Sequence, residues 1–459
     1  MAGASLSLRR LTRRDDMPGM LLDYAQAALL TSGPWIMTVA AVAAVSFLGL
    51  PYVNTDGMAI FRSILIYNFA FSLVLSGPIL LVATRFLADS LYRGTTANGR
   101  NILVAALALV YGVGALAAVP FYGLAADLTP MVRVVAITNY FVVAGIWVGA
   151  VFQVKQRDVR IVTIAFLIGM MTAVAASTAL AATFGLTGLI WGFTAGLAII
   201  QFTLIGHVLR SYPAGLNEPA ALLGQFRRYW LLAVAGFVSP AAAWGDKWVM
   251  WLSGEGRAFG GFMRQYPLYD SAMFMAVLSM VPAIAMFTIF LKSDFLDHYR
   301  AFYQSVEQHD TLAQIRQTHR RIVSSLAEGG RQLLILQAVI AASVTLLAPA
   351  IIDLARLQYI QLGMLRLGTL AAGFHVTFIF ASILLLYFDL RRSYLYLQLL
   401  FLITNAGLTG ALLPLGLPYY GLGYFAASVL CFVVSVVTLY RALIRLPYLT
   451  FVANNPSVR

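Results

Sequence analysis

The residues best placed to do chemistry in this chain are three charges that lie inside long apolar runs. Arg62 lies in one such run, and Asp246 and Lys247 are neighbours in another, within the stretch AAAWGDKWVMWL at 241–252. A charge at the centre of a membrane helix costs about 3 kcal/mol or more and usually faces a cavity or a partner. All three are therefore candidates for a functional site, although Lys247 could instead extend to the membrane surface with Asp246 as its neutralising neighbour.

The same stretch contains three tryptophans, Trp244, Trp248 and Trp251. On a helix with 100° per residue they fall within about 60° of one another, with Lys247 about 40° from Trp251 and Asp246 roughly on the opposite side. We therefore expect Asp246 and Lys247 to have separate partners. Lys247 would contact the indole rings, and Asp246 would pair with Arg62 or take up a proton. The tryptophans could line a path for sugar rings or form an aromatic belt at the outer membrane boundary.

Other residue types that support catalysis or metal binding are scarce. His375 is the one histidine of five that falls in the middle of an apolar run; no carboxylate is near it in sequence, which favours a packing or pore role. Cys431 is the single cysteine, so one chain can form neither a disulfide nor a cysteine metal site. The sequence also has neither a DxD motif nor a glycine-rich phosphate loop. We expect no enzyme activity, no cofactor and no metal.

The elements that must position these residues are membrane helices. The chain of 459 residues is 61% hydrophobic and 11% charged, with a mean hydropathy of +0.83, which predicts an all-α integral membrane protein. Windows of about 19 residues indicate about twelve spans. They lie near 21–50, 60–88, 101–126, 131–153, 159–183, 186–209, 230–254, 266–292, 331–353, 360–388, 393–415 and 419–444. The first run is too long for a signal peptide and lacks a cleavage site, so we expect it to be retained.

The net charge of +13 follows from the membrane topology. With both termini in the cytoplasm, 24 of the 31 lysines and arginines lie on the inner side of the twelve spans. This asymmetry obeys the positive-inside rule and makes nucleic-acid binding unnecessary as an explanation.

The spans divide into two sets of six at the inner connection 210–229. Two pairs of similar segments support a parallel internal repeat. VLSGP at 74–78 resembles VLSMVP at 277–282, and GLTG at 185–188, where the sixth span starts, resembles GLG at 421–423, where the twelfth starts. Such repeats are typical of transporters with two related halves. We predict a cytoplasmic segment 1–20, an N-lobe 21–209, a linker 210–229, a C-lobe 230–446 and a cytoplasmic tail 447–459.

The inner connection 293–330 is predicted to be helical, because Phe295, Tyr299, Phe302 and Val306 recur at helical spacing. Its aromatic face, Tyr299, Phe302 and Tyr303, is a candidate docking surface for a cytoplasmic partner. The alternative is a helix that lies on the inner membrane surface.

Several stretches, spread from the first span to the C-terminus, resemble a known family. They are LLTSGPWIM (29–37), WGDKWVMW (244–251), PLYDSAMFMAVLSMVPAIAMF (267–287), SDFLDHYRAFYQSV (293–306), LLLYFDLRRSYL (384–395) and PYLTFVANNP (447–456). Together with the doubled lobe they resemble the multidrug/oligosaccharidyl-lipid/polysaccharide (MOP) flippase superfamily, and within it the PelG family of Pel exopolysaccharide transporters. The N-terminus GASLSLRRL departs from the glycine- and phenylalanine-containing start typical of that family.

The resemblance implies a bacterial inner-membrane exporter of an amino-sugar-rich polymer, or of a glycan-bearing carrier, through the cleft between two six-helix lobes. It implies PelD, PelE and PelF-like proteins as partners in a polysaccharide synthase complex. Two other hypotheses stay open: a cation-coupled exporter of small amphiphiles or lipids, with Asp246 as the coupling acid, and a non-conducting scaffold for a glycosyltransferase. The intramembrane charges should matter to an exporter, whereas the 293–330 face should matter to a scaffold.

Overall fold

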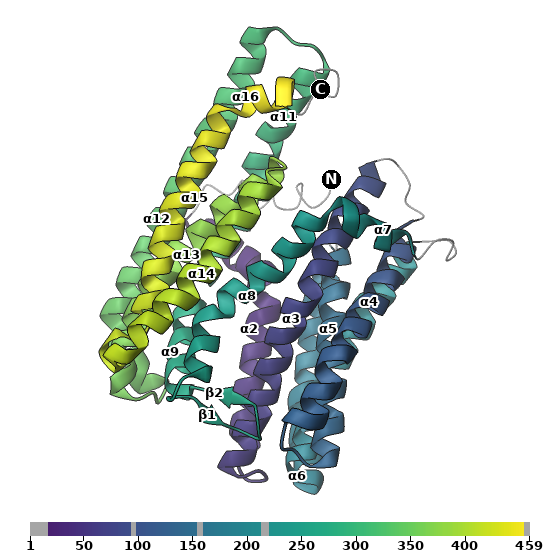
Figure 1. The fold of residues 1–459 in the computed structure, drawn as a ribbon, viewed down its shortest axis with the longest axis vertical. Coiled ribbons are helices and arrows are strands. Elements are labelled where there is room, and N and C mark those ends of the chain that lie inside the picture. Colours follow the sequence, from purple (N-terminus) through teal and green to yellow (C-terminus); the bar gives the residue numbers. More distant parts are fainter. Residues whose placement is uncertain (1–16, 93–97, 154–158, 213–219, 454–459) are drawn as a thin grey trace. The chain divides into compact units, whose positions relative to one another are not determined.

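The structure is a computed structural model that describes residues 17–92, 98–153, 159–212 and 220–453. The chain forms two compact units. The N-terminal unit is Gly33–Tyr266, and the C-terminal unit is Pro267–Arg459 together with Met1–Ser32. Each unit is a bundle of long helices (Figure 1).

The N-terminal unit contains the second half of α2 and ends in a short antiparallel hairpin. Its elements are α2 (Met17–Leu48), α3 (Thr55–Tyr92), α4 (Asn98–Pro120), η1 (Phe121–Ala125), α5 (Pro130–Phe152), α6 (Val159–Ser211), α7 (Ala221–Arg228), α8 (Trp230–Leu252), β1 (Arg257–Ala258) and β2 (Arg264–Gln265). Helix α3 is central, since it packs against α8, α5 and α4, while α6 packs along α5.

Close packing of α3 on α8 depends on two glycines. A Cβ atom at Gly77 would overlap the carbonyl oxygen of Gly236, and a Cβ atom at Gly236 would overlap that of Gly77. Small residues at such a crossing let two backbones approach each other. The crossing fixes α8, and with it Asp246 and Lys247, against α3.

The C-terminal unit is built around α13. Its elements are α9 (Pro267–Leu278), α10 (Val281–Phe290), η3 (Leu291–Phe295), α11 (Leu296–Glu307), α12 (Leu312–Leu354), η4 (Tyr359–Gln361), α13 (Leu362–Tyr387), α14 (Arg391–Leu412), η5 (Leu413–Leu415), η6 (Leu417–Tyr419), α15 (Leu422–Ile444), α16 (Leu446–Tyr448) and η7 (Leu449–Ala453). Helix α13 packs against α15, α12, α9 and α14, and α14 packs along α15.

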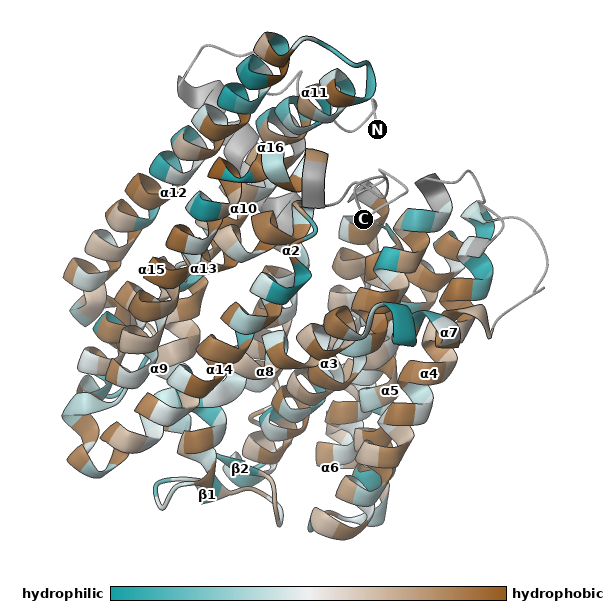
Figure 2. Cartoon of the chain, turned by 45° about the horizontal axis from the view of Figure 1, so that its top comes forward, coloured by the Kyte–Doolittle hydropathy of each residue, from teal (hydrophilic) through white to brown (hydrophobic). Residues whose placement is uncertain are grey.

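The distribution of hydropathy is that of a membrane protein. Hydrophobic residues dominate the long helices, whereas hydrophilic residues gather near helix ends, for example on α7 and around α11 (Figure 2). Within the described ranges, nine helical segments are long and apolar enough to cross a membrane, and the apolar stretch Gly33–Leu48 is shorter. The all-α membrane fold predicted from the sequence is confirmed.

Every predicted span coincides with helical structure, but the match is not one-to-one throughout. The eighth predicted span is divided between α9 and α10. Helix α6 is 53 residues long and covers the fifth and sixth predicted spans, with a break at Gly185, whose φ is 57°. Helix α8 covers the seventh span but is not among the nine, because Asp246, Lys247 and its tryptophans lower its mean hydropathy.

The boundary between the two compact units differs from the predicted boundary at 210–229. Helix α8 belongs to the N-terminal unit, because it packs along α3, although the sequence analysis assigned it to the C-lobe. The assignment of two six-helix lobes stays a prediction.

Candidate transport site

Asp246 and Lys247 bind each other. The Nζ atom of Lys247 lies 2.9 Å and 3.1 Å from the two carboxylate oxygens of Asp246. The Asp246 side chain is fully buried, and that of Lys247 is 14% exposed. The expectation that these neighbours point apart is therefore wrong, because the four-carbon lysine chain is long enough to reach back across the helix surface.

Arg62 differs from this pair in its surroundings. It is an exposed residue in the first half of α3, seven positions after the first helical residue, whereas Asp246 is buried in α8. Asp246 forms an ion pair with Lys247, and a pairing of Arg62 with Asp246 stays a prediction. A contribution of Arg62 to transport stays a prediction.

Two of the three tryptophans of α8 stack on aromatic residues of α3. Trp251 stacks on Tyr67 with ring centroids 5.1 Å apart, and Trp248 stacks on Phe71 at 5.5 Å. Trp244 lies 5.9 Å from Trp251. Because Trp251 is only 3% exposed, it is not a residue of a lipid-facing aromatic belt.

Three further aromatic residues extend this face, and the sequence interpretation missed them. Tyr67 and Phe71 are 5.4 Å apart on α3, and Tyr67 also stacks on Phe121 at 5.6 Å, with an interplanar angle of 16°. The sequence did contain a signal for them, because Tyr67 and Phe71 are four positions apart and so lie on the same side of a helix. The helix that they would face could not be inferred from a single span. We call Trp244, Trp248, Trp251, Tyr67, Phe71 and Phe121 the aromatic face.

The β1–β2 hairpin holds one end of the aromatic face. The Tyr67 hydroxyl accepts from the backbone N–H of Arg264 and donates to its carbonyl oxygen, at 2.8 Å each. The Arg264 guanidinium donates to the carbonyl oxygens of Ser253 (3.1 Å) and Gly256 (2.8 Å), the turn at the end of α8. Tyr67 therefore connects the helix interface to the hairpin.

A pocket of about 140 Å³ adjoins the aromatic face between α3, α4 and α5. It is lined by Tyr67, Asn68, Phe71, Leu75, Ala117, Ala118, Phe121, Tyr122 and Tyr140. Flat aromatic walls of this kind can stack on a sugar ring or enclose a hydrocarbon chain.

A buried chain of uncharged hydrogen bonds begins at the pocket wall, which includes Tyr122 and Asn68. Tyr122 donates to Asn68 Oδ1 (2.7 Å), Asn68 Nδ2 donates to Asn139 Oδ1 (2.8 Å), and Asn139 Nδ2 donates to Thr194 Oγ1 (2.9 Å). The chain joins α3, α5, α6 and η1. Satisfied polar networks in membrane helices fix neighbouring helices in one arrangement.

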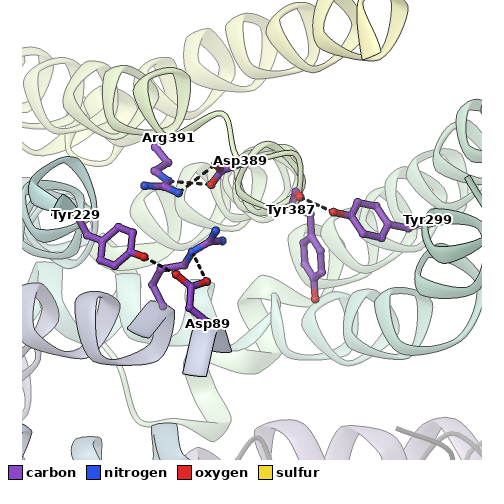
Figure 3. A network of polar contacts seen from close by, with 7 residues as sticks. Asp89, Tyr229, Tyr299, Tyr387, Asp389 and Arg391 are labelled. Atoms are coloured by element: carbon purple, nitrogen blue, oxygen red, sulfur yellow. Dashed lines mark hydrogen bonds and ion pairs between the residues drawn. The ribbon is translucent and has the colours of Figure 1, made fainter. Parts of the chain in front are cut away.

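Polar contacts also brace the ends of helices. The Tyr229 hydroxyl donates to Asp89, and Arg85 Nε lies 3.2 Å from the other carboxylate oxygen of Asp89 (Figure 3). Burial, followed by the hydrogen bond to Asp89, raises the pKa of Tyr229. In the C-terminal unit, Arg391 binds Asp389 at 2.8 Å (Figure 3).

The predicted docking surface is largely part of the internal packing. Phe302 is fully buried, and Tyr299 and Tyr303 are half-buried, with ring centroids 4.6 Å apart. Tyr299 also donates to the carbonyl oxygen of Tyr387 at 3.1 Å (Figure 3). The prediction of an exposed aromatic patch that includes Phe302 is therefore wrong, because this side of α11 packs on α12 and on the end of α13.

The helical prediction for 293–330 is confirmed, with a different division. Helix α11 is followed by α12, which begins after a capping box at Thr311 and Gln314 and continues through the ninth predicted span. Across the described part of the chain, the acidic, histidine and cysteine side chains form no group of three that could hold a metal ion.

Known proteins share this sequence pattern and this architecture. A protein-family model named PelG, with the description "Putative exopolysaccharide Exporter (EPS-E)", matches residues 1–451. The chain belongs to the PelG family. The resemblance seen in the sequence is thereby confirmed. No curated protein matches the sequence of this PelG-family chain.

Solved structures similar to this PelG-family chain are transporters of the MOP superfamily. An outward-facing multidrug resistance MATE transporter matches with a TM-score of 0.66 and 13% identity, covering 98% of this chain and 99% of the other. The inward-facing conformation of a MATE transporter gives 0.62 and 13%, covering 91% and 99%. A MOP transporter from Pyrococcus furiosus, whose binding pocket is described as of reverse polarity, gives 0.65 and 13%, covering 92% and 97%. The chain is thus a multi-pass membrane protein with the fold of these transporters.

Proposed function

We propose that this protein exports the Pel exopolysaccharide, or a carrier that bears its glycan units, across the bacterial inner membrane between its two six-helix lobes. Both termini and residues 293–330 lie in the cytoplasm in this proposal. The observation that supports it most is the PelG family match over residues 1–451.

The aromatic face gives the proposal a physical basis. Sugar rings present C–H groups that pack on flat aromatic rings, and such contacts tolerate sliding because they are not directional in the plane of the ring. Phe71, Phe121 and Trp248 are half-buried, so parts of their rings are open to a ligand. A polymer can move past such surfaces without breaking strong individual bonds.

The experiment replaces the chromosomal copy with the variants Phe71→Ala and Trp248→Ala and measures secreted polymer against the amount of protein in the membrane. We expect reduced export at a normal protein level. The matched control is Phe202→Ala on α6, because Phe202 is 69% exposed and belongs to no part of the aromatic face. Equal export in all three variants would remove the aromatic face from the path.

A second candidate is a cation-coupled exporter of small molecules or lipids. The similarity in fold to multidrug MATE transporters supports it. Asp246 forms an ion pair with Lys247, so a coupling role for it would require this pair to open. Export of an amphiphilic dye by cells that lack the other polysaccharide genes would favour this candidate.

The proposal includes assembly with PelD, PelE and PelF-like subunits. Their contact surface would have to lie elsewhere than the buried side of α11. Co-purification of the three subunits with the full chain tests the assembly, and recovery of the chain alone after mild solubilisation and crosslinking would contradict it. A scaffold that does not conduct would keep this assembly and tolerate the loss of the aromatic face.

A further inference from the structure

His375 lies in the middle of α13, inside the C-terminal unit, whereas the aromatic face belongs to the N-terminal unit. It is 8% exposed. Its Nδ1 atom is 2.7 Å from the hydroxyl of Tyr424 on α15, and its ring centroid is 4.5 Å from that of Phe401 on α14. The imidazole is therefore held between three helices.

The seam around His375 carries further buried polar groups. Ser428 lies one turn after Tyr424 on α15, and Thr409 on α14 packs against Gly423, next to Tyr424. Thr409 is 6% exposed and Ser428 is fully buried, and within the described residues their hydroxyl oxygens have no hydrogen-bond partner. The seam therefore contains buried hydroxyl groups on both α14 and α15.

The N-terminal unit provides a contrast. Its buried chain of Tyr122, Asn68, Asn139 and Thr194 consists of amides and hydroxyls that are hydrogen-bonded to one another. None of those side chains changes charge between about pH 5 and 8, whereas histidine does. Of these two clusters, the one around His375 contains a side chain that can respond to protons in this range.

We propose that His375 and Tyr424 form a proton-binding site in the seam of α13, α14 and α15, and that protonation of His375 controls a step of export. The inference rests on the proposed export function.

Proton uptake would reverse one hydrogen bond. In the neutral ring one nitrogen lacks a hydrogen, so the Tyr424 hydroxyl can donate to Nδ1. A proton taken from water converts the ring to imidazolium, in which both nitrogens carry hydrogen, so Nδ1 must then donate and Tyr424 must accept. The Tyr424 hydrogen has to turn to another acceptor, and a positive charge appears between three packed helices. That charge favours a rearranged seam in which water or oxygen atoms approach the ring.

The helices that pack on α13 present different side chains near His375. Helix α15 presents Tyr424, which is titratable, and α14 presents the uncharged ring of Phe401. Helix α12 contributes Gln337, which lies against Gly373, and α10 contains no titratable residue.

The charged residues nearest to this part of α13 have other surroundings. Arg366 lies nine positions before the histidine, about 13 Å along the helix axis. It donates to the carbonyl oxygen of Thr345. Asp270 is at the start of α9, which packs on α13 beside Gly368, seven positions before the histidine. Both charges therefore lie toward the beginning of α13 and not at its middle.

The first test measures proton uptake by the purified full-length protein between pH 8 and pH 5. His375→Gln should remove one proton from the titration, and Tyr424→Phe should shift the midpoint of that proton. The matched control is His207→Gln on α6, whose Nδ1 lies 3.0 Å from Gln153 Oε1. In that variant the proton assigned to His375 should remain. A His375→Gln titration that still contains that proton would overturn the site.

The second test measures export as a function of pH in cells made permeable to protons. The protonated fraction of a histidine changes roughly tenfold over two pH units around its midpoint. Export by the wild type and by His207→Gln should follow that change, and export by His375→Gln should be flat. A wild-type pH profile in His375→Gln at normal protein level would show a packing role. If the wild type itself exports no polymer, the proposed function fails while the titration still decides the site.

Discussion

The Nζ atom of Lys247 lies 2.9 Å from a carboxylate oxygen of Asp246, the residue before it in α8. Successive residues on a helix point about 100° apart, so the contact requires the lysine chain to fold back along the helix surface. Each charge thus has its countercharge within the same helix. The pair enters the apolar interior of the N-terminal unit with no net charge.

The first prediction concerns that pair. Asp246→Asn leaves Lys247 without a countercharge, and Lys247→Met leaves the buried Asp246 carboxylate without one. Each single variant should therefore lose about 3–5 kcal/mol of stability. The double variant Asp246→Asn/Lys247→Met removes both charges and should recover most of that loss. Thermal unfolding of the purified protein in detergent measures the three values.

Export measured in the same strains separates structure from transport. If the double variant is stable but secretes little polymer, the charges act in transport. If the double variant loses as much stability as the two single variants together, Asp246 and Lys247 do not form the ion pair seen in the structure.

The sequence predicted the membrane fold well because apolar length is a property of each segment alone. It placed a helix at every span, including the break in α6 near Gly185, and it put the three tryptophans on one side of α8. It failed where the outcome depends on the reach of a side chain or on a partner helix. A helical wheel gives the direction of a Cβ atom, so it separated Lys247 from Asp246.

Partner helices explain the other failures. The aromatic side of α11 looked free because nothing in residues 293–330 indicates that α12 and the end of α13 cover Phe302. Tyr67 and Phe71 were overlooked because only the α8 tryptophans opposite them give those rings a function in packing.

The second prediction tests the crossing of α3 and α8. Gly77→Ala and Gly236→Ala each place a methyl group against the carbonyl oxygen of the other glycine, and overpacking of this kind costs about 1–3 kcal/mol. Gly206→Ala on α6 is the control, because a Cβ atom there meets no other atom within 4 Å. Midpoints of thermal unfolding should fall for the first two variants only. A stable Gly236→Ala protein would mean that the helices cross at a greater distance.

The third prediction follows from the burial of Phe302. Phe302→Ala should cost about 3–5 kcal/mol, because it removes a large side chain from a packed site. Ala301→Ser, on the exposed side of α11, should change stability little. Protein levels and unfolding midpoints measure the loss of stability. If Phe302 instead contacts a partner, the purified Phe302→Ala protein should be as stable as the wild type but should no longer co-purify the other subunits.

The fourth prediction concerns the hairpin and its anchor. Tyr67→Phe keeps the ring between Trp251 and Phe121 but removes both hydrogen bonds to Arg264, each worth about 0.5–1.5 kcal/mol. The hairpin should open more often, so trypsin should cleave faster after the exposed Arg257. Tyr52→Phe, in an exposed position before α3, should leave the cleavage rate unchanged. Equal rates in the two variants would show that the hairpin is held by its other contacts.

The last prediction fixes the orientation of the chain. The excess of lysine and arginine on one side of the spans indicates that residue 310 lies in the cytoplasm and residue 257 outside. Cys431 is buried and can be replaced by serine, which leaves single cysteines at Asp310→Cys or Arg257→Cys as reporters. An impermeant maleimide added to intact spheroplasts should label position 257 and not 310, and 310 should react once the membrane is permeabilised. Labelling of 310 in intact spheroplasts would invert the topology. The hairpin beside the aromatic face would then lie on the cytoplasmic side, at the entrance of the proposed path and not at its exit.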